Sequence, residues 1–342
     1  MAPVVDVHSH LYPRSYIDLL KARERPPQIV EHADAERFVA FAAETKADTP
    51  GRPIDSSYWS VDAKLHYLDR EGIDQAVISL GNPWLDPIED DSAVAVARAL
   101  NEEFAALEGA TGGRLVGLGV LPQRDPETAA QVAEEIGASG TLYGVANGCL
   151  LCRRPLDDSD LDPVWAVLER TRLPFVVHPH YGIGGDVLGE PGYALALAFP
   201  FETTLALVRL LLGGVLERFP GLRIVAVHGG GALPYLAGRV DAFWETGALG
   251  NRKSRNPPSA GLAKLALDAV LYGPGPLRNA VDLVGASRVM FGTDHPFAVA
   301  DAPGGMAAID QVLDGEARSL VRGGAAVAYF GLPAVTAGSA AA

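Results

Sequence analysis

Short runs rich in valine, isoleucine and leucine recur along the chain, separated by segments whose apolar residues have helical spacing. Examples of the helical segments are residues 91–107, 126–138, 162–172 and 202–219. The strand-like runs are eight in number, at residues 4–8, 75–80, 115–122, 142–148, 174–179, 223–229, 265–271 and 288–294. Strands that alternate with helices predict parallel βαβ units. Eight such units predict a (β/α)8 barrel, whose active site lies at the carboxyl ends of its strands.

An open, doubly wound α/β sheet is the alternative architecture. Such a sheet is expected to carry a phosphate-binding loop after its first strand, but the chain reads HSHLYP there. Two connections exceed the usual length, residues 14–60 after the first strand and residues 180–200 after the fifth. Both insertions are expected over the mouth of the barrel. No internal repeat or low-complexity linker divides the chain, so we predict a single barrel domain over residues 1–342.

Side chains that bind metals stand at the ends of four predicted strands. His8 ends the first run and His10 follows two residues later, and residues i and i+2 of a strand face the same side. His178 ends the fifth run, His228 the sixth and Asp294 the eighth. Each alone is typical of a structural residue, but the carboxyl ends of the barrel strands converge. Because neutral imidazole is a common metal ligand, the sequence predicts a metal site at that convergence.

The fourth predicted strand favours one metal ion over two. Its end reads YGVANGCLL, which offers no lysine, glutamate or histidine to bridge a second ion. We therefore predict one divalent metal ion per chain. A catalytic metal site must also leave one position open for water or substrate.

This arrangement resembles the amidohydrolase superfamily, and the resemblance extends over essentially the whole chain. Within that superfamily the chain is similar to the branch that contains aminocarboxymuconate semialdehyde decarboxylase and uracil-5-carboxylate decarboxylase. The similar stretches are FPFETTLALVRLLLGGVLERFPGLRIVAVHGGGALPYLAGR (199–239), GTDHPF (292–297), GRPIDSSYWSVDAKLHYLD (51–69) and SLGNPW (79–84).

The resemblance implies roles for individual residues. It implies that His8, His10, His178 and Asp294 bind one Zn²⁺, or Mn²⁺ as the alternative. It also implies that His228 stays unligated and moves a proton, with Asp294 as a second candidate for proton transfer. Finally, it implies that Arg52 and Arg239 bind a substrate carboxylate, and that Arg239 reaches in from the neighbouring subunit of a homodimer.

Three further residues are candidates for substrate contact because of their positions. Trp84 and Phe297 lie near the ends of the second and eighth predicted strands, where they would either wall the pocket or belong to the core. His180 lies two residues beyond His178 and would contact substrate or support a ligand.

The predicted activity is metal-dependent decarboxylation of an unsaturated or aromatic carboxylate. A metal electrophile, a proton donor and two arginines suit that chemistry, and no organic cofactor is needed. GIGGDVLG (182–189) lacks the strand–turn–helix context of a dinucleotide site. A metal-dependent hydrolase of amides, lactones or esters, or a hydratase, remains the alternative, because a fold does not determine a function.

Charge and composition narrow the choice of partners. The chain has 28 basic and 42 acidic residues, a formal net charge of −14, which disfavours nucleic acid and anionic membranes. We expect no membrane-spanning run, no secretion signal and a cytoplasmic location. The two cysteines, Cys149 and Cys152, indicate a reducing compartment rather than a disulfide framework, and we interpret their CxxC spacing as structural.

Overall fold

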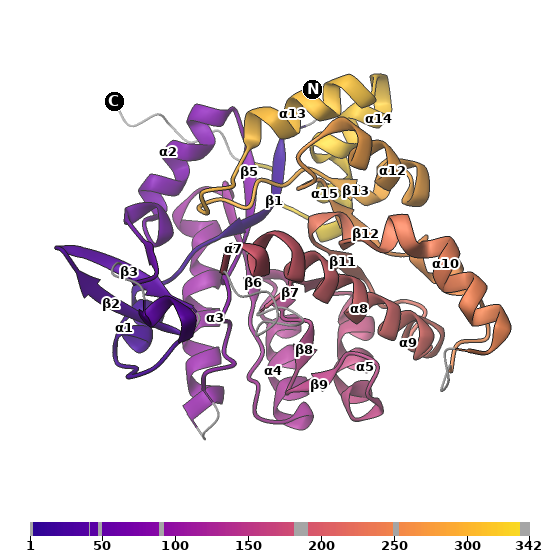
Figure 1. Cartoon of the computed structure of the whole chain (residues 1–342). Helices are drawn as coiled ribbons and strands as arrows, with labels where there is room; N and C mark the ends of the chain where they lie inside the picture. Colours follow the sequence, from indigo (N-terminus) through magenta and orange to yellow (C-terminus); the bar gives the residue numbers. More distant parts are fainter. Residues whose placement is uncertain are drawn as a thin grey trace.

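A computed structural model describes residues 3–40, 42–46, 50–88, 92–180, 191–248 and 253–335. Its main sheet has eight parallel strands, each hydrogen-bonded to the next in chain order (Figure 1). These strands are β1 (Val5–His10), β5 (Gln75–Ser79), β6 (Leu115–Gly119), β7 (Leu142–Asn147), β10 (Phe175–Val177), β11 (Ile224–Ala226), β12 (Ala266–Asp268) and β13 (Val289–Met290). All eight coincide with a predicted run. The expected (β/α)8 barrel is therefore confirmed, and the doubly wound alternative is wrong.

Backbone hydrogen bonds join the last strand to the first. Val7 N–H donates to the Phe291 carbonyl at 2.9 Å, and His10 N–H donates to the His295 carbonyl at 2.8 Å. β1 continues through His10 instead of ending at His8, because Ser9 and His10 still pair with Ile78 and Ser79 of β5. The register shifts between Asp6 and Ser9, which is how strands re-aim side chains beside active sites.

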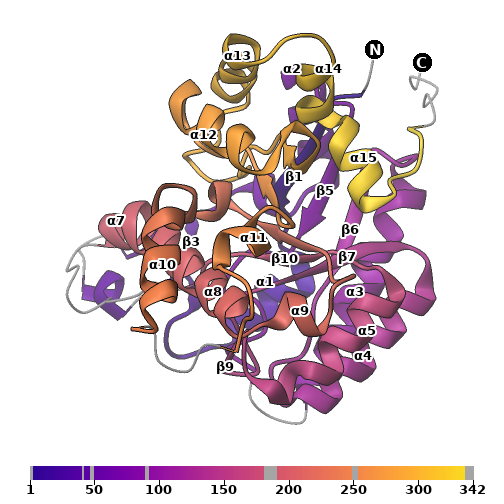
Figure 2. The same ribbon diagram turned by 90° about the vertical axis from the view of Figure 1, so that its right-hand side faces the viewer.

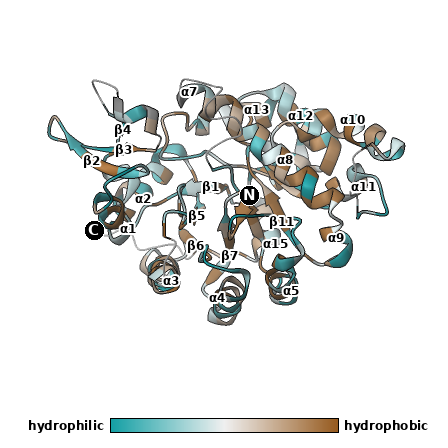
Figure 3. Ribbon diagram, turned by 60° about the horizontal axis from the view of Figure 1, so that its bottom comes forward, coloured by the Kyte–Doolittle hydropathy of each residue, from teal (hydrophilic) through white to brown (hydrophobic). Residues whose placement is uncertain are grey.

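Helices cover the outside of the barrel, and most buried strand residues are apolar (Figures 2 and 3). The helices that follow barrel strands β5 to β7 are regular and amphipathic, because apolar residues recur on their inner face. Their bounds are α3 (Ser92–Ala110), α4 (Pro126–Ser139) and α5 (Asp162–Thr171). The later helices are α10 (Leu233–Thr246), α11 (Pro258–Leu262), α12 (Pro274–Val284), α13 (Ala302–Val312), α14 (Gly315–Ser319) and α15 (Ala325–Phe330).

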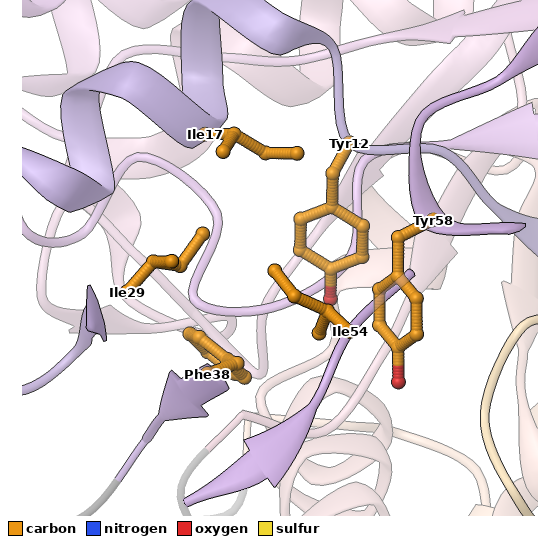
Figure 4. Close-up of a pocket in the computed structure, with 6 residues that line it drawn as sticks. All are labelled: Tyr12, Ile17, Ile29, Phe38, Ile54 and Tyr58. Atoms are coloured by element: carbon orange, nitrogen blue, oxygen red, sulfur yellow. The ribbon is translucent and has the colours of Figure 1, made fainter. Parts of the chain in front are cut away.

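The first insertion forms a small layer beside the barrel (Figure 1). It contains α1 (Arg14–Lys21) and an antiparallel sheet, and α2 (Val61–Glu71) follows it. The sheet strands are β2 (Gln28–His32), β3 (Ala35–Val39) and β4 (Arg52–Pro53). Six mostly apolar side chains line a small pocket of about 10 Å³ between this sheet, α1 and the barrel (Figure 4): Tyr12, Ile17, Ile29, Phe38, Ile54 and Tyr58. The insertion is therefore a packed structure rather than an open loop. A two-stranded ribbon follows β7, formed by β8 (Leu150–Leu151) and β9 (Arg154–Pro155).

The helical segment predicted over residues 202–219 is interrupted. The structure has α8 (Phe199–Leu212) and the short α9 (Val215–Arg218), with Gly214 between them at φ 69°. This left-handed backbone conformation favours glycine and ends the first helix. Residues 181–190 of the second predicted insertion lie outside the described residues, whereas its end, α7 (Pro191–Tyr193) and a π-helical turn (Ala194–Ala198), leads directly into α8.

One segment corrects the expectation that no run is long and apolar enough to cross a membrane. Ala194–Leu212 has that length and a mean hydropathy of 1.7. Charged residues are sparse in this segment, and 44% of it is buried inside the protein. Core helices of folded proteins meet the same criterion, since one of their faces packs against a sheet.

Candidate active site

Three histidines present the same ring nitrogen to one point at the carboxyl ends of the strands. His8 Nδ1 hydrogen-bonds to Asp268 Oδ2 at 2.5 Å, and His178 Nδ1 donates to the Pro179 carbonyl at 2.6 Å. His10 Nδ1 hydrogen-bonds to Ser79 Oγ at 3.0 Å. In each ring the remaining nitrogen, Nε2, is left for the cluster. Such an outer hydrogen bond is typical of metal-binding histidines because it fixes the ring and its tautomer.

The donor atoms lie within a few ångströms of one another. His8 Nε2 is 3.1 Å from His10 Nε2, and Asp294 Oδ1 is 3.2 and 3.3 Å from these two nitrogens. His228 Nε2 is 3.8 Å from Asp294 Oδ2. Donor atoms of His8, His178, His228 and Asp294 all lie within 4.8 Å of one another. The structure therefore gathers all five residues predicted from the strand ends.

His178 supplies the clearest sign that the cluster binds something. Its ring is buried, and in the described part of the chain its Nε2 has no hydrogen-bond partner. Because Nδ1 donates to a carbonyl, Nε2 must carry a lone pair rather than a proton. A buried acceptor without a partner costs free energy, so its retention indicates a ligand.

Three site residues have a left-handed backbone: Trp84, with φ 57°, His228 and Asp294. Asp294 has φ 64° and His228 has φ 53°, a region that side chains other than glycine rarely adopt. Gly231, three residues after His228, has φ 66°, and a Cβ there would lie 2.1 Å from the Pro200 carbonyl oxygen. Glycine is therefore required in the HGGG turn, which aims His228 at Asp294. Strained residues of this kind cluster at functional sites.

The electrostatics of the metal-free cluster favour an ionised carboxylate. Burial alone would raise the pKa of Asp294, but the positive charge of His8 and the nearby ring nitrogens of His10 and His228 hold it well below its usual range. Burial and then the neighbouring imidazoles lower the pKa of His178 well below 6.5. A charged carboxylate beside a neutral imidazole is the donor set that a divalent cation requires.

Asp268 is a site residue that the strand-end argument missed. It ends β12, is fully buried and holds His8, while its Oδ1 accepts the Gly229 N–H at 2.9 Å. One carboxylate thus fixes the ring of His8 and the turn that carries His228. A clue was present in the sequence, because an aspartate inside the apolar run LALDAV must find a buried partner.

Trp84 and Phe297, the two aromatic candidates, both contact the histidines. The Trp84 ring meets His178 edge-on with 5.5 Å between centroids, and Phe297 lies 5.3 Å from the ring of His10. Tyr58, from the insertion, contacts Phe297 in turn at 6.0 Å. Phe297 and Tyr58 thus form an aromatic wall that leads from His10 to the first insertion. Trp84 is 1% exposed and belongs to the core, where it packs against His178.

His180 lies beside this wall and is itself held firmly. Its Nε2 pairs with Asp86, its backbone N–H donates to the Glu202 carboxylate, and burial lowers its pKa to about 4. Burial, reinforced by Glu202, raises the pKa of Asp86 to about 7. Burial therefore favours the uncharged form of both groups.

The two candidate arginines lie away from the histidine cluster. Arg52 is on β4, where its guanidinium lies 5.5 Å from the ring of Phe38 and its Nε is 3.9 Å from Glu44. Burial raises the pKa of Tyr58, and the positive charge of Arg52 opposes that rise. Arg239 is exposed on α10 over Phe243.

Comparisons with known proteins agree with this geometry. Residues 5–332 match the family described as amidohydrolase. The chain belongs to the amidohydrolase family. It is 26% identical over 96% of its length to 2-amino-3-carboxymuconate-6-semialdehyde decarboxylase of Dictyostelium discoideum, covering 91% of that protein. The sequence-based assignment to this family and its decarboxylase branch is therefore confirmed.

Solved structures of amidohydrolase fold are also similar. The apo IDCase of Metarhizium anisopliae superposes with a TM-score of 0.88 at 34% identity, covering 96% of this chain and 97% of that one. A dihydroxybenzoic acid decarboxylase of Polaromonas sp. JS666, with a TM-score of 0.76 and 21% identity, covers 97% of both chains. Its structure contains manganese and the inhibitor 2-nitroresorcinol.

Proposed function

We propose that this amidohydrolase is a metal-dependent decarboxylase that releases CO₂ from an unsaturated or aromatic carboxylate without an organic cofactor. The observation that carries the proposal is the cluster of His8, His10, His178, His228 and Asp294, in which the buried Nε2 of His178 has no partner among the described residues. The decarboxylases among its relatives support the choice of reaction.

His8, His10, His178 and Asp294 would hold one divalent ion. The anchored rings fit this role, because three Nδ1 atoms are already hydrogen-bonded and leave Nε2 to bind. Imidazole suits Zn²⁺, and a carboxylate in the set also suits Mn²⁺. When bound, the metal supplies an electrophile for the carboxylate and for a neighbouring oxygen of the substrate.

His228 is the proposed proton donor. Loss of CO₂ leaves an electron pair on the substrate carbon, and a proton must reach that carbon to complete the reaction. The His228 side chain is 15% exposed, more open than the fully buried His10, and its Nδ1 has no hydrogen bond within the described chain. Its Nε2 faces Asp294 Oδ2, so that carboxylate can orient the imidazole or take part in the transfer.

We assign substrate binding to the aromatic wall and the first insertion. Phe297 offers an apolar face for an unsaturated or aromatic ring, Trp84 supports His178 from the core, and His180 is the proposed polar contact. Arg52 is the proposed partner of a substrate carboxylate, because a planar guanidinium donates two parallel hydrogen bonds. Its Nε is buried and makes no hydrogen bond to the described residues.

A substrate panel tests the proposal. Metal-loaded protein is assayed for CO₂ with uracil-5-carboxylate, aminocarboxymuconate semialdehyde and hydroxybenzoates such as γ-resorcylate, alongside esters, lactones and amides. We expect CO₂ from at least one carboxylate. Efficient turnover of a lactone or amide, with no CO₂ from any carboxylate, would instead establish the hydrolase alternative.

We also propose a homodimer in which Arg239 completes the neighbouring site. The support is an exposed apolar stripe on the helix that ends in α8, at four-residue spacing: Tyr193, Leu197, Phe201 and Leu205. α10 lies against α8 (Figure 2) and exposes Tyr235 and Phe243, one turn either side of Arg239. A second copy would cover this apolar face and deliver the arginine.

Mixing two inactive variants tests the shared arginine. Arg239→Ala and His228→Ala protomers should recover part of the activity when mixed, because one site in each mixed dimer would have every group intact. Mixed dimers confirmed by mass spectrometry but devoid of activity would contradict sharing. A wild-type monomer that sediments with lipid vesicles would instead assign the apolar stripe to a membrane.

A further inference from the structure

Lys64 is a charged residue buried completely in the wall of the barrel. It lies on α2, its side chain has 0% exposure, and burial lowers its pKa to about 7. A lysine is almost never fully buried unless its ammonium is paired, because the head group normally reaches water. The partners of Lys64 must therefore offset the free-energy cost of burying its ammonium group.

Those partners are the two segments that carry the proposed metal ligands. Lys64 Nζ donates to Ser9 Oγ at 2.9 Å, and Ser9 stands between His8 and His10. The same nitrogen hydrogen-bonds to His295 Nδ1 at 2.5 Å and donates to the His295 carbonyl at 3.2 Å, directly after Asp294. Three acceptors match the three N–H groups of an ammonium, so no donor is left for substrate.

The backbone of these two segments is also cross-linked. Asp294 N–H donates to the His8 carbonyl at 2.8 Å, and His10 N–H donates to the same His295 carbonyl that Lys64 contacts. Asp6 accepts the N–H groups of His8 and Thr293, at 3.0 and 3.1 Å. Lys64 therefore adds a further link between β1 and the segment after β13, from outside the strands.

Asp294 needs these cross-links because its backbone conformation is strained. Its φ of 64° persists only where neighbouring contacts over-determine the conformation. Tyr67, one turn after Lys64, stacks on the His295 ring with centroids 3.7 Å apart and prevents that ring from turning away. α2 therefore contacts His295, the residue that follows Asp294, rather than the metal cluster itself.

We propose that Lys64 is a positioning residue that holds Asp294 and the His8–His10 pair in the geometry required for metal binding. This inference rests on the proposed metal site and assigns to α2 a part in forming it. Within the described part of the chain, Lys64 Nζ hydrogen-bonds to Ser9 and His295 and not to the donor atoms, so its effect passes through these two residues.

Lys64→Met tests the role, because methionine fills most of the space of the lysine stem and removes the ammonium. The readout is the dissociation constant for Zn²⁺ or Mn²⁺, measured by chelator competition on folded protein without substrate. We expect it to rise by about 10–100-fold, the usual effect of losing a group that orients a metal ligand. At saturating metal, kcat should fall while KM for the carboxylate changes little.

Leu68→Ala is the matched control. Leu68 is also fully buried on α2, one turn further on, but it contributes only apolar contacts. It should lower the melting temperature and leave the metal dissociation constant unchanged. Equal loosening of the metal by Leu68→Ala and Lys64→Met would show that any damage to α2 suffices, and would overturn the proposal.

Ser9→Ala keeps the proposal testable if Lys64→Met does not fold. It removes one of the three acceptors of Lys64, and the metal dissociation constant should rise by several-fold, less than for the lysine variant. Folded variants with wild-type metal affinity would refute the role of Lys64 alone. Wild-type protein that binds neither ion would refute the metal site and, with it, this role.

Discussion

Two neighbouring strands of the barrel end in polar residues that behave differently. β7 ends in Asn147 and β10 leads into His178, and the His178 N–H donates to the Asn147 carbonyl at 3.0 Å. Asn147 Oδ1 accepts from Gln123 at 2.7 Å, and its Nδ2 donates to the Leu150 carbonyl at 2.9 Å. His178 has one ring nitrogen bonded and the other without a partner in the described chain.

The difference separates structural from functional polar residues at one end of one barrel. A buried polar group whose hydrogen bonds are all made stabilises the fold. A buried group that retains one unmade bond costs stability and is kept where a ligand completes it. By this criterion the fourth strand of the barrel contributes structure, the fifth contributes a metal ligand, and one metal ion per chain is expected.

Replacing these two residues in turn should give the largest contrast. His178→Ala should lose the metal and reduce CO₂ release to background, because a proposed ligand is gone. Asn147→Ala should keep the metal and lose stability, by about 1–3 kcal/mol for the partners left unpaired. Elemental analysis and thermal unfolding of both variants check this expectation. Loss of metal from Asn147→Ala would contradict the distinction between a structural residue and a metal ligand.

His228 tests whether every unpartnered histidine of the cluster is a ligand. We expect His228→Ala to keep about one metal ion per chain and to lose turnover by about 10²–10⁴-fold, the usual contribution of a proton donor. Metal content and kcat are measured on the same preparation. A metal-free His228→Ala protein would make His228 a ligand and require a different proton donor.

The same comparison of bonded and unbonded groups applies to two arginines, one of which, Arg52, lies in the insertion. Its Nε makes no hydrogen bond to the described residues, whereas Arg98 on α3 is fully paired with Glu135 at 2.8 and 2.5 Å. Arg52→Ala should lower kcat/KM by about 30–150-fold, equivalent to about 2–3 kcal/mol for a charged hydrogen-bonded pair. Arg98→Ala is the control and should leave kcat/KM unchanged; equal effects would remove Arg52 from the substrate site.

Asp268 gives the smallest expected effect, because it acts on a ligand and not on the metal. Asp268→Asn keeps the acceptor for the Gly229 N–H but loses the charge that fixes His8. The metal dissociation constant should rise by about 10–100-fold with little change in melting temperature. An unchanged metal affinity would show that His8 needs no anchor.

The sequence predicted the barrel because its signal is local and repeated. Each strand run and each amphipathic helix can be read without knowing its neighbours, and the strand ends of a barrel must converge. The same rule was enough to bring His8, His10, His178, His228 and Asp294 together. Helix and strand ends were less exact, as the break at Gly214 and the extension of β1 through His10 show.

Residues that act through a partner were harder to predict. Lys64 and Asp268 are typical helix and strand residues until their partners, 231 and 260 positions away in the sequence, are known. The placement of Arg52 and Arg239 depends on an inserted sheet and on a possible neighbouring chain, neither of which periodicity describes. Those two roles stay predictions.

Metal titration of stripped protein tests the central claim most directly. The metal is removed with a chelator, Zn²⁺ or Mn²⁺ is added back in measured amounts, and CO₂ release is followed with the best carboxylate of the panel. The account predicts no activity without metal and a maximum at one ion per chain. A maximum at two ions per chain, or full activity in the stripped protein, would contradict it.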